Sequence, residues 1–260
     1  MNSTEILIKI YKHECYINFS SLIILLLIFA AYLWFVLIAG PKYMKKREAC
    51  NVTNLIRTYN IYQVFCCIFY VVGSYSLGFT LNHLFKCQRF AFLDDDARLS
   101  IYVGSWLFLS LRVHEFIETI FFILRKKFNQ ASFLHIFHHI GSVATTWLFI
   151  VSNAELMAVY IAQLNSAVHI IMYTYYFISS FKDKRIQNVI SRVKPLITII
   201  QLLQFVIIIA HCTIAILPDC GASYFFHLQI LNFVILFILF GKFFVDTYSR
   251  SELQLINIKT

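Results

Sequence analysis

Seven stretches of about 20 apolar residues constrain the fold of this chain more than any other feature of its sequence. A run of about 20 apolar residues is the length at which an α-helix crosses the roughly 30 Å hydrocarbon core of a bilayer. A helix also satisfies its backbone polar groups internally, as lipid surroundings require. The stretches lie at residues 20–39, 58–81, 101–124, 132–151, 156–181, 195–217 and 223–247. The sequence therefore predicts an all-α, polytopic membrane protein of seven transmembrane helices, with residues 1–260 forming a single domain.

The composition agrees with a membrane protein and excludes several soluble classes. Of 260 residues, 60% are hydrophobic and 13% are charged, which excludes a secreted soluble enzyme and a disordered chain. The net charge of +9 arises because 22 Lys and Arg oppose 13 Asp and Glu. Positive-inside loops produce this excess, so it does not indicate a nucleic-acid partner.

The basic residues alternate between the two sides of the predicted membrane. Five of them, Lys9, Lys12, Lys86, Arg89 and Arg98, lie on one side, and Arg112 lies within a helix. The other sixteen lie on the opposite side: Lys42, Lys45, Lys46, Arg47, Arg57, Arg125, Lys126, Lys127, Lys182, Lys184, Arg185, Arg192, Lys194, Lys242, Arg250 and Lys259. The richer side is cytosolic. We therefore expect a lumenal N-terminus and a cytosolic C-terminus.

Ionisable and amide side chains within the predicted helices gather at one depth. The third to sixth helices carry them in their cytosolic halves, whereas the first two helices carry almost none there. Spacings of three or four residues place the members of each group on one helix face. The sequence therefore predicts a polar chamber that opens to the cytosol, lined by Arg112, Glu115, Glu118, His135, His138, His139, His169, Gln201 and Gln204.

Each group in this chamber has a structural alternative. Arg112 with Glu115 is better interpreted as a buried ion pair than as an acid–base couple, because an unpaired charge there would be costly. The two glutamines can equally be hydrogen-bonded links between helices. Tyr173 and Tyr176 offer hydroxyl groups on an apolar wall, which suits a lipid-like substrate with one polar end, or they can form an interfacial aromatic belt.

The histidines are the strongest chemical signal in the sequence. His135, His138 and His139 share one face of a membrane helix that has no structural need for them, which favours catalysis. An imidazole removed from water is neutral and can act as a nucleophile or a base.

Four motifs in chain order resemble those of the ELO family of very-long-chain fatty acid elongases. Residues 135–139, HIFHH, match its HxxHH box, and residues 165–176, NSAVHIIMYTYY, match its NxxxHxxMYxYY element. Residues 112–119, RVHEFIET, resemble its KxxExxDT element, with Arg112 in place of Lys and Glu118 in place of Asp. Thr198, Gln201 and Gln204 resemble its TxxQxxQ element. Both departures keep the charge and change its reach, so they bear on positioning rather than on the class of reaction.

The resemblance implies a condensing enzyme of the endoplasmic reticulum membrane. Such an enzyme joins a fatty acyl-CoA to malonyl-CoA, releases carbon dioxide and CoA, and forms a 3-ketoacyl-CoA two carbons longer. We expect no cofactor beyond these substrates. The resemblance also implies partnership with the reductases and the dehydratase of the elongation cycle, and a homodimer is left open.

Roles for the site residues follow from this chemistry. We predict His138 as the nucleophile that forms an acyl-imidazole, with His135, His139 and His169 as the other catalytic histidines. Donors from His169, Gln201, Gln204 or Tyr173 would stabilise the developing oxyanion. Arg125, Lys126 and Lys127 are placed to attract the CoA phosphates.

Two further expectations concern cysteine and metal. Cys87 and Cys220 are predicted to pair in lumenal loops, or to be two unrelated thiols. No metal is expected, because the histidine triplet lacks a conventional set of additional ligands apart from the Glu115 and Glu118 face, which Arg112 is expected to neutralise.

Two rival functions remain. A membrane di-iron desaturase or hydroxylase also uses HxxHH boxes but needs about eight clustered histidines, more than these motifs provide. A seven-helix receptor or transporter would leave the histidine cluster without a purpose.

Overall fold

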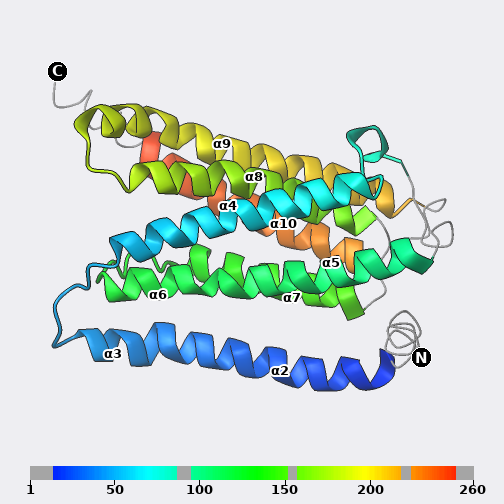
Figure 1. Cartoon of the computed structure of the whole chain (residues 1–260), viewed down its shortest axis with the longest axis horizontal. Coiled ribbons are helices and arrows are strands. Elements are labelled where there is room, and N and C mark those ends of the chain that lie inside the picture. The colour runs from blue at the N-terminus through cyan, green and yellow to red at the C-terminus, as the bar shows by residue number, and fades with distance from the viewer. Residues whose placement is uncertain (1–13, 87–94, 152–156, 218–223, 250–260) are drawn as a thin grey trace. The chain divides into compact units, whose positions relative to one another are not determined.

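The computed structural model describes residues 14–86, 95–151, 157–217 and 224–249, and its regular elements there are all helical (Figure 1). This confirms the all-α fold class for the described part of the chain. The chain divides into two compact units, each built from separate segments. Unit 1 comprises Met1–Val52 and Arg89–Glu155, and unit 2 comprises Thr53–Gln88 and Leu156–Thr260.

Unit 1 holds the first, third and fourth predicted helices. Helix α2 spans Glu14–Trp34 and continues through a π-helical turn, Phe35–Ala39, into α3 at Gly40–Met44. Pro41 is the second residue of α3, after Gly40. A proline within a helix removes a backbone donor and crowds the carbonyl four residues earlier, and a π-helical turn accommodates both effects. The unit is completed by α5 at Asp95–His114, α6 at Phe116–Leu124 and α7 at Phe133–Val151.

The approach of α3 to α6 depends on a glycine. A Cβ atom added at Gly40 would lie 2.8 Å from Cγ2 of Ile123 and 2.9 Å from the carbonyl oxygen of Phe35. Ile123 is completely buried. The missing side chain at Gly40 therefore allows α3 to pack directly on the part of α6 that ends at Leu124.

Unit 2 consists of four long helices and two short helical segments among the described residues. Helices α4 (Thr53–Ser76), α8 (Met157–Ser179), α9 (Lys184–Ala215) and α10 (Tyr224–Phe244) pack in that order, each against the next (Figure 1). A 3₁₀ turn at Leu81–His83 follows α4, and a π-helical segment at Val245–Ser249 follows α10.

His211 ties three parts of unit 2 together. Its Nε2 lies 2.7 Å from the carbonyl oxygen of Met157, at the start of α8, and its Nδ1 faces the carbonyl oxygen of Leu84. The side chain is 1% exposed, so the ring has backbone carbonyl groups around it in place of water, and a neutral ring donates to one of the two. This histidine fixes the end of α9 to the start of α8.

Five helices in the described residues are long and apolar enough to cross a membrane. They are Ser20–Met44, Thr53–Ser76, Phe133–Val151, Lys184–Ala215 and Tyr224–Tyr248. The other two predicted segments are also helical but are not among these five: α8 contains Gln163, Asn165 and His169, and the third segment is divided between α5 and α6.

The sequence placed the start of the sixth helix too late. We predicted residues 195–217, whereas α9 begins at Lys184, so Lys184, Arg185, Arg192 and Lys194 lie on its first turns rather than in a loop. Asp183 caps this helix by accepting hydrogen bonds from the backbone N–H groups of Arg185, at 2.8 Å, and Ile186, at 3.2 Å. The error arose because a run of apolar residues identifies only the part of a helix that can lie in a membrane, and the first turns of α9 are polar.

Gly40→Ala is expected to destabilise the protein by about 1–3 kcal/mol, because the new methyl group overpacks the α3–α6 contact. Gly73→Ala on α4 is the matched control. A Cβ there meets nothing within 4 Å, and alanine favours a helix over glycine by about 1 kcal/mol. Thermal unfolding in detergent should therefore show a lower Tm for Gly40→Ala only, and equal Tm values for the two variants would contradict this account of the packing.

Candidate functional site

The three histidines of α7 form a cluster in unit 1. The ring centroids of His135 and His139 lie 4.2 Å apart, and those of His138 and His139 lie 5.4 Å apart. His139 is buried, whereas His135 and His138 are half-buried. Spacings of three and four residues on one helix bring the rings together, as the sequence predicted.

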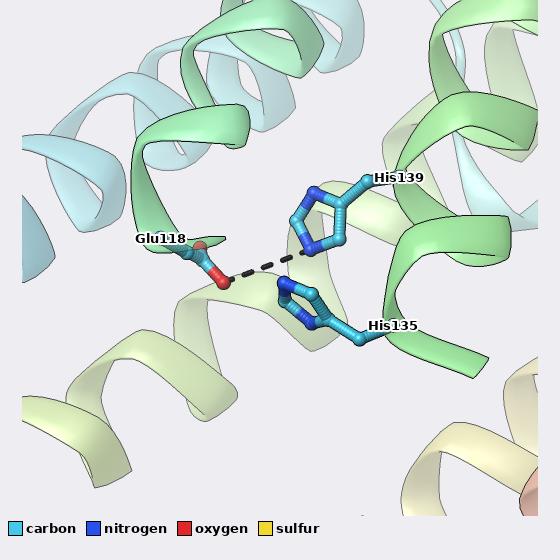
Figure 2. A group of neighbouring side chains, drawn as sticks. All are labelled: Glu118, His135 and His139. Atoms are coloured by element: carbon cyan, nitrogen blue, oxygen red, sulfur yellow. Dashed lines mark ion pairs between the residues drawn. The ribbon is translucent and has the colours of Figure 1, made fainter. Parts of the chain in front are cut away.

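Helix α6 faces this cluster with two polar side chains. A carboxylate oxygen of Glu118 lies 3.8 Å from Nε2 of His139, as Figure 2 shows. The hydroxyl oxygen of Thr119, the next residue, lies 2.9 Å from Nε2 of His135. Thr119 was part of a quoted motif but was not among the predicted site residues. A threonine in a membrane helix carries no distinctive signal until its partner is known.

Glu118, His135 and His139 can together hold a metal ion. Each offers one ligand atom, and these three atoms lie within 4.8 Å of one another (Figure 2). Two imidazoles and a carboxylate are the donor set of several zinc and iron sites. Glu118 was expected to be neutralised by Arg112, but its carboxylate faces His139. The expectation that the site holds no metal therefore stays a prediction.

Arg112 and Glu115 form an ion pair in the core of unit 1. The guanidinium Nη2 lies 2.9 Å from a carboxylate oxygen of Glu115, and both side chains are 0% exposed. The guanidinium carbon also lies 4.7 Å from the centre of the Phe108 ring, a cation–π arrangement. The geometry fits the structural ion pair that we preferred for these residues over an acid–base couple.

His169 lies among aromatic side chains in unit 2. Its ring centroid is 5.5 Å from that of Tyr173, whose ring lies 6.1 Å from that of Tyr176. His169 is 4% exposed and Tyr173 is 0% exposed, whereas Tyr176 is 39% exposed. Tyr173 is therefore placed beside His169, and Tyr176 lies closer to the surface of the unit.

Helix α4 contributes polar residues that the sequence did not predict. The ring of Tyr59 lies edge-on to that of Tyr173 at 6.1 Å, and Gln63 donates to the Tyr59 hydroxyl at 2.6 Å. Asn60 and Gln63 are 3% and 0% exposed. The expectation that the second predicted helix carries almost no polar groups in its cytosolic half was therefore wrong. Uncharged Tyr, Asn and Gln give a weaker signal than His or Glu.

The two predicted glutamines of α9 occupy different positions. Gln201 donates to the sulfur of Met172 at 3.4 Å, which links α9 to α8. Because these neighbouring helices run in opposite directions, the residues one turn further on, Gln204 and His169, are at the same level. Gln204 is 3% exposed, and its amide nitrogen has no hydrogen-bond partner within the described residues. Gln204 thus has a donor available for a ligand.

The basic residues Arg125, Lys126 and Lys127 follow the end of α6. Lys126 has a positive φ of 56°, and its N–H and that of Lys127 bond to the carbonyl oxygens of Ile123 and Phe122. Lys126 and Lys127 are exposed, and Arg125 is half-buried. The chain therefore presents cations where α6 ends.

Two predicted residues cannot be placed. Cys87 and Cys220 lie outside the described residues, so their disulfide stays a prediction.

The ion pair yields a stability prediction. Arg112→Met or Glu115→Leu alone is expected to destabilise the protein by about 3–5 kcal/mol, because each leaves one buried charge without its partner. The double variant Arg112→Met with Glu115→Leu should be more stable than either single variant. Urea unfolding of the four proteins measures the coupling, and additive effects of the two changes would contradict the pairing.

Comparison with known proteins places the chain in a family. The model of ELO, described as the GNS1/SUR4 family, matches residues 17–254. Very long chain fatty acid elongase 4 of Homo sapiens is 35% identical, over 85% of this chain and 70% of the relative. Elongase 1 of Mus musculus is 30% identical, over 86% of this chain and 81% of the relative.

A third relative gives the same result. Very long chain fatty acid elongase F of Drosophila melanogaster is 37% identical, over 74% of this chain and 75% of the relative. The family match covers the four motifs and both units. This multi-pass membrane protein, with its histidine cluster on α7, belongs to the ELO family.

Proposed function

We propose that this protein condenses a long-chain fatty acyl-CoA with malonyl-CoA to form a 3-ketoacyl-CoA two carbons longer, with release of carbon dioxide and CoA. Membership of a family whose relatives are named as fatty acid elongases supports the reaction. The observation that carries it on this chain is the cluster of three histidine rings on α7, two of which meet Glu118 and Thr119 of α6.

The first half-reaction uses a histidine nucleophile. A neutral nitrogen of His138 attacks the thioester carbonyl of the acyl-CoA, and the carbon–sulfur bond breaks. The hydrogen on the other ring nitrogen of His138 passes to the departing sulfur, so CoA leaves as the thiol. The product is an acyl-imidazole, which persists where water is excluded. Half-burial of His138 beside buried His139 suits this requirement.

The second half-reaction makes the new carbon–carbon bond. Malonyl-CoA loses carbon dioxide, and the resulting enolate carbon attacks the acyl-imidazole carbonyl. The carbon–nitrogen bond breaks, and the departing imidazole nitrogen takes up a proton from solvent, which returns His138 to its neutral form. Negative charge develops on the thioester oxygen of malonyl-CoA during decarboxylation, and a buried donor can stabilise it. His169 and the amide of Gln204 are the donors we assign to this role, with Gln201 and Tyr173 beside them.

The remaining residues bind and orient the substrates. The exposed Lys126 and Lys127, together with Arg125, attract the CoA phosphates electrostatically. Glu118 faces the histidines directly, whereas Arg112 and Glu115 orient the site from the core of unit 1 by holding the start of α6, and Tyr176 lies at the outer end of the tyrosine group.

The wider setting follows from the family. We propose that the two units act as one elongase domain with seven transmembrane helices, a lumenal N-terminus and a cytosolic C-terminus. The enzyme would reside in the endoplasmic reticulum membrane, where the reductases and the dehydratase of the cycle would process its product. Beyond acyl-CoA and malonyl-CoA it would need no cofactor, and a homodimer stays a prediction.

His138→Ala is expected to abolish release of CoA from acyl-CoA supplied alone, because that release requires the nucleophile. His169→Ala should still release CoA but should slow condensation by about 10²- to 10³-fold, since it removes an oxyanion donor. The measurement is free thiol and covalent acylation of purified protein, with and without malonyl-CoA.

His227→Ala serves as the matched control, because His227 is an exposed histidine on α10. This variant should behave as the wild type in both half-reactions. If His138→Ala releases CoA and becomes acylated, the nucleophile is a different histidine. If the wild type releases no CoA without malonyl-CoA, a ternary-complex condensation replaces the covalent mechanism.

A metal-dependent desaturase or hydroxylase is the second candidate, because Glu118, His135 and His139 can hold an ion. Such a di-iron enzyme would need about eight histidine ligands, twice the four in the motifs of this chain. We expect elemental analysis of the active protein to find no stoichiometric zinc or iron, and chelators to leave condensation unchanged. Stoichiometric metal together with chelator-sensitive activity would contradict the proposal.

A further inference from the structure

A tyrosine of the first helix reaches the histidine cluster through two hydrogen bonds. The hydroxyl oxygen of Tyr32, on α2, lies 2.8 Å from that of Thr119, which in turn lies 2.9 Å from Nε2 of His135. Tyr32 is 7% exposed and Thr119 is 0% exposed. The connection therefore runs through the interior of unit 1.

Aromatic packing fixes the position of the Tyr32 hydroxyl. The Tyr32 ring stacks on that of Phe116, with centroids 4.1 Å apart and an interplanar angle of 15°. Phe29, one turn earlier on α2, also contacts Phe116, at 6.4 Å. Because Phe116 begins α6, the helix that carries Thr119 is held against the tyrosine.

The number of hydrogens on each group sets the direction of the two bonds. A phenol and a threonine hydroxyl each donate one hydrogen, and both also accept. If His135 donated from Nε2 to Thr119, one hydroxyl hydrogen would need a further acceptor. It would be that of Tyr32 if Thr119 donated to Tyr32, or that of Thr119 if it accepted from both neighbours. Within the described residues, the hydroxyl of Tyr32 bonds to Thr119.

The reverse direction uses both hydroxyl hydrogens. Tyr32 donates to Thr119, Thr119 donates to Nε2 of His135, and neither buried hydroxyl is left with an unused hydrogen. Nε2 of His135 then acts as an acceptor, so its proton resides on Nδ1. His135 is neutral in this arrangement, because an imidazolium would carry a hydrogen on both nitrogens.

This arrangement separates the roles of the histidines. With its Nε2 lone pair engaged by Thr119, His135 is a poor nucleophile and cannot ligate a metal through that atom. Its ring is held 4.2 Å from that of His139. His138 shares the cluster without this restraint from Thr119, which is consistent with its role as the nucleophile.

We propose that Tyr32 is a positioning residue that acts through Thr119 to hold His135 as the neutral, Nδ1-protonated form against His139. The proposal rests on the proposed condensing function and adds to it a residue from the first helix. Without the phenol hydroxyl, Thr119 can either donate to His135 or accept from it, so the direction of the bond is no longer set.

The test compares variants that change one hydroxyl at a time. Tyr32→Phe keeps the ring on Phe116 and should lower the single-turnover rate of CoA release by about tenfold to a hundredfold, with KM for acyl-CoA unchanged. Thr119→Val should have a similar effect, Thr119→Ser should retain most of the wild-type rate, and the double variant Tyr32→Phe with Thr119→Val should be no worse than Thr119→Val.

Tyr43→Phe is the matched control, since Tyr43 is an exposed tyrosine of the same unit. It should leave the rate unchanged. A wild-type rate in Tyr32→Phe, or a loss in Thr119→Ser as large as in Thr119→Val, would overturn the proposal.

Nitrogen-15 spectra of histidine-labelled protein provide a readout that does not depend on activity. Subtraction of the His135→Asn spectrum identifies the signals of His135. These signals should show the Nδ1-protonated tautomer in the wild type and a mixture of tautomers in Tyr32→Phe. An Nε2-protonated or doubly protonated His135 in the wild type would overturn the proposal.

The two readouts distinguish the two possible failures. If wild-type protein condenses no acyl-CoA but His135 is Nδ1-protonated and responds to Tyr32→Phe, the proposed function fails and the hydrogen-bonded arrangement stands. If the protein is active but His135 does not respond, the inference fails and the proposed function stands.

Discussion

The fully buried ion pair between Arg112 and Glu115 determines how the rest of unit 1 can be arranged. The pair lies where α5 ends and α6 begins. At this junction the backbone N–H of Glu115 bonds to the carbonyl oxygen of Arg112, and that of Glu118 bonds to the carbonyl oxygen of Glu115, each three residues earlier. Neither charge can move away from the other without a large desolvation cost. The pair therefore fixes the start of α6, and Glu118 and Thr119 lie three and four residues further on, where they face the histidines of α7.

Both units use aromatic rings to hold polar groups in an apolar interior. In unit 1, Phe116 stacks on Tyr32, whose hydroxyl meets Thr119. In unit 2, Tyr173 contacts both His169 and Tyr59, and Tyr59 accepts a hydrogen bond from Gln63. A flat ring with one polar atom fills volume and places that atom precisely, with few rotatable bonds. The abundant Phe and Tyr residues thus help to position the polar groups of the site, in addition to making the sequence apolar enough for a membrane.

The apolar runs predicted most of the helices. They failed at the helix ends that are determined by a capping side chain or by a buried ion pair. The fourth and fifth runs, 132–151 and 156–181, correspond closely to α7 and α8. The sixth predicted segment began eleven residues after Lys184, the first residue of α9. The start of α9 is determined by the cap that the Asp183 side chain provides, and apolar length does not record a cap. The third prediction was continuous, whereas a buried charge pair divides it at Glu115. Hydropathy is a sum over residue types, so it records neither helix-capping hydrogen bonds nor ion pairs between side chains.

The sequence by itself determined the helical fold class, the family and the grouping of the α7 histidines, because spacings of three and four residues act within one helix. Tertiary structure decided which side chains from other helices complete those groups. Tyr32 lies 87 residues before Thr119, and nothing in the pattern around either one selects the other. Tyr59 and Gln63 were missed for the same reason. An uncharged hydroxyl or amide is common in membrane helices, and it acquires a role only when packing places it within 3 Å or so of a partner on a neighbouring helix.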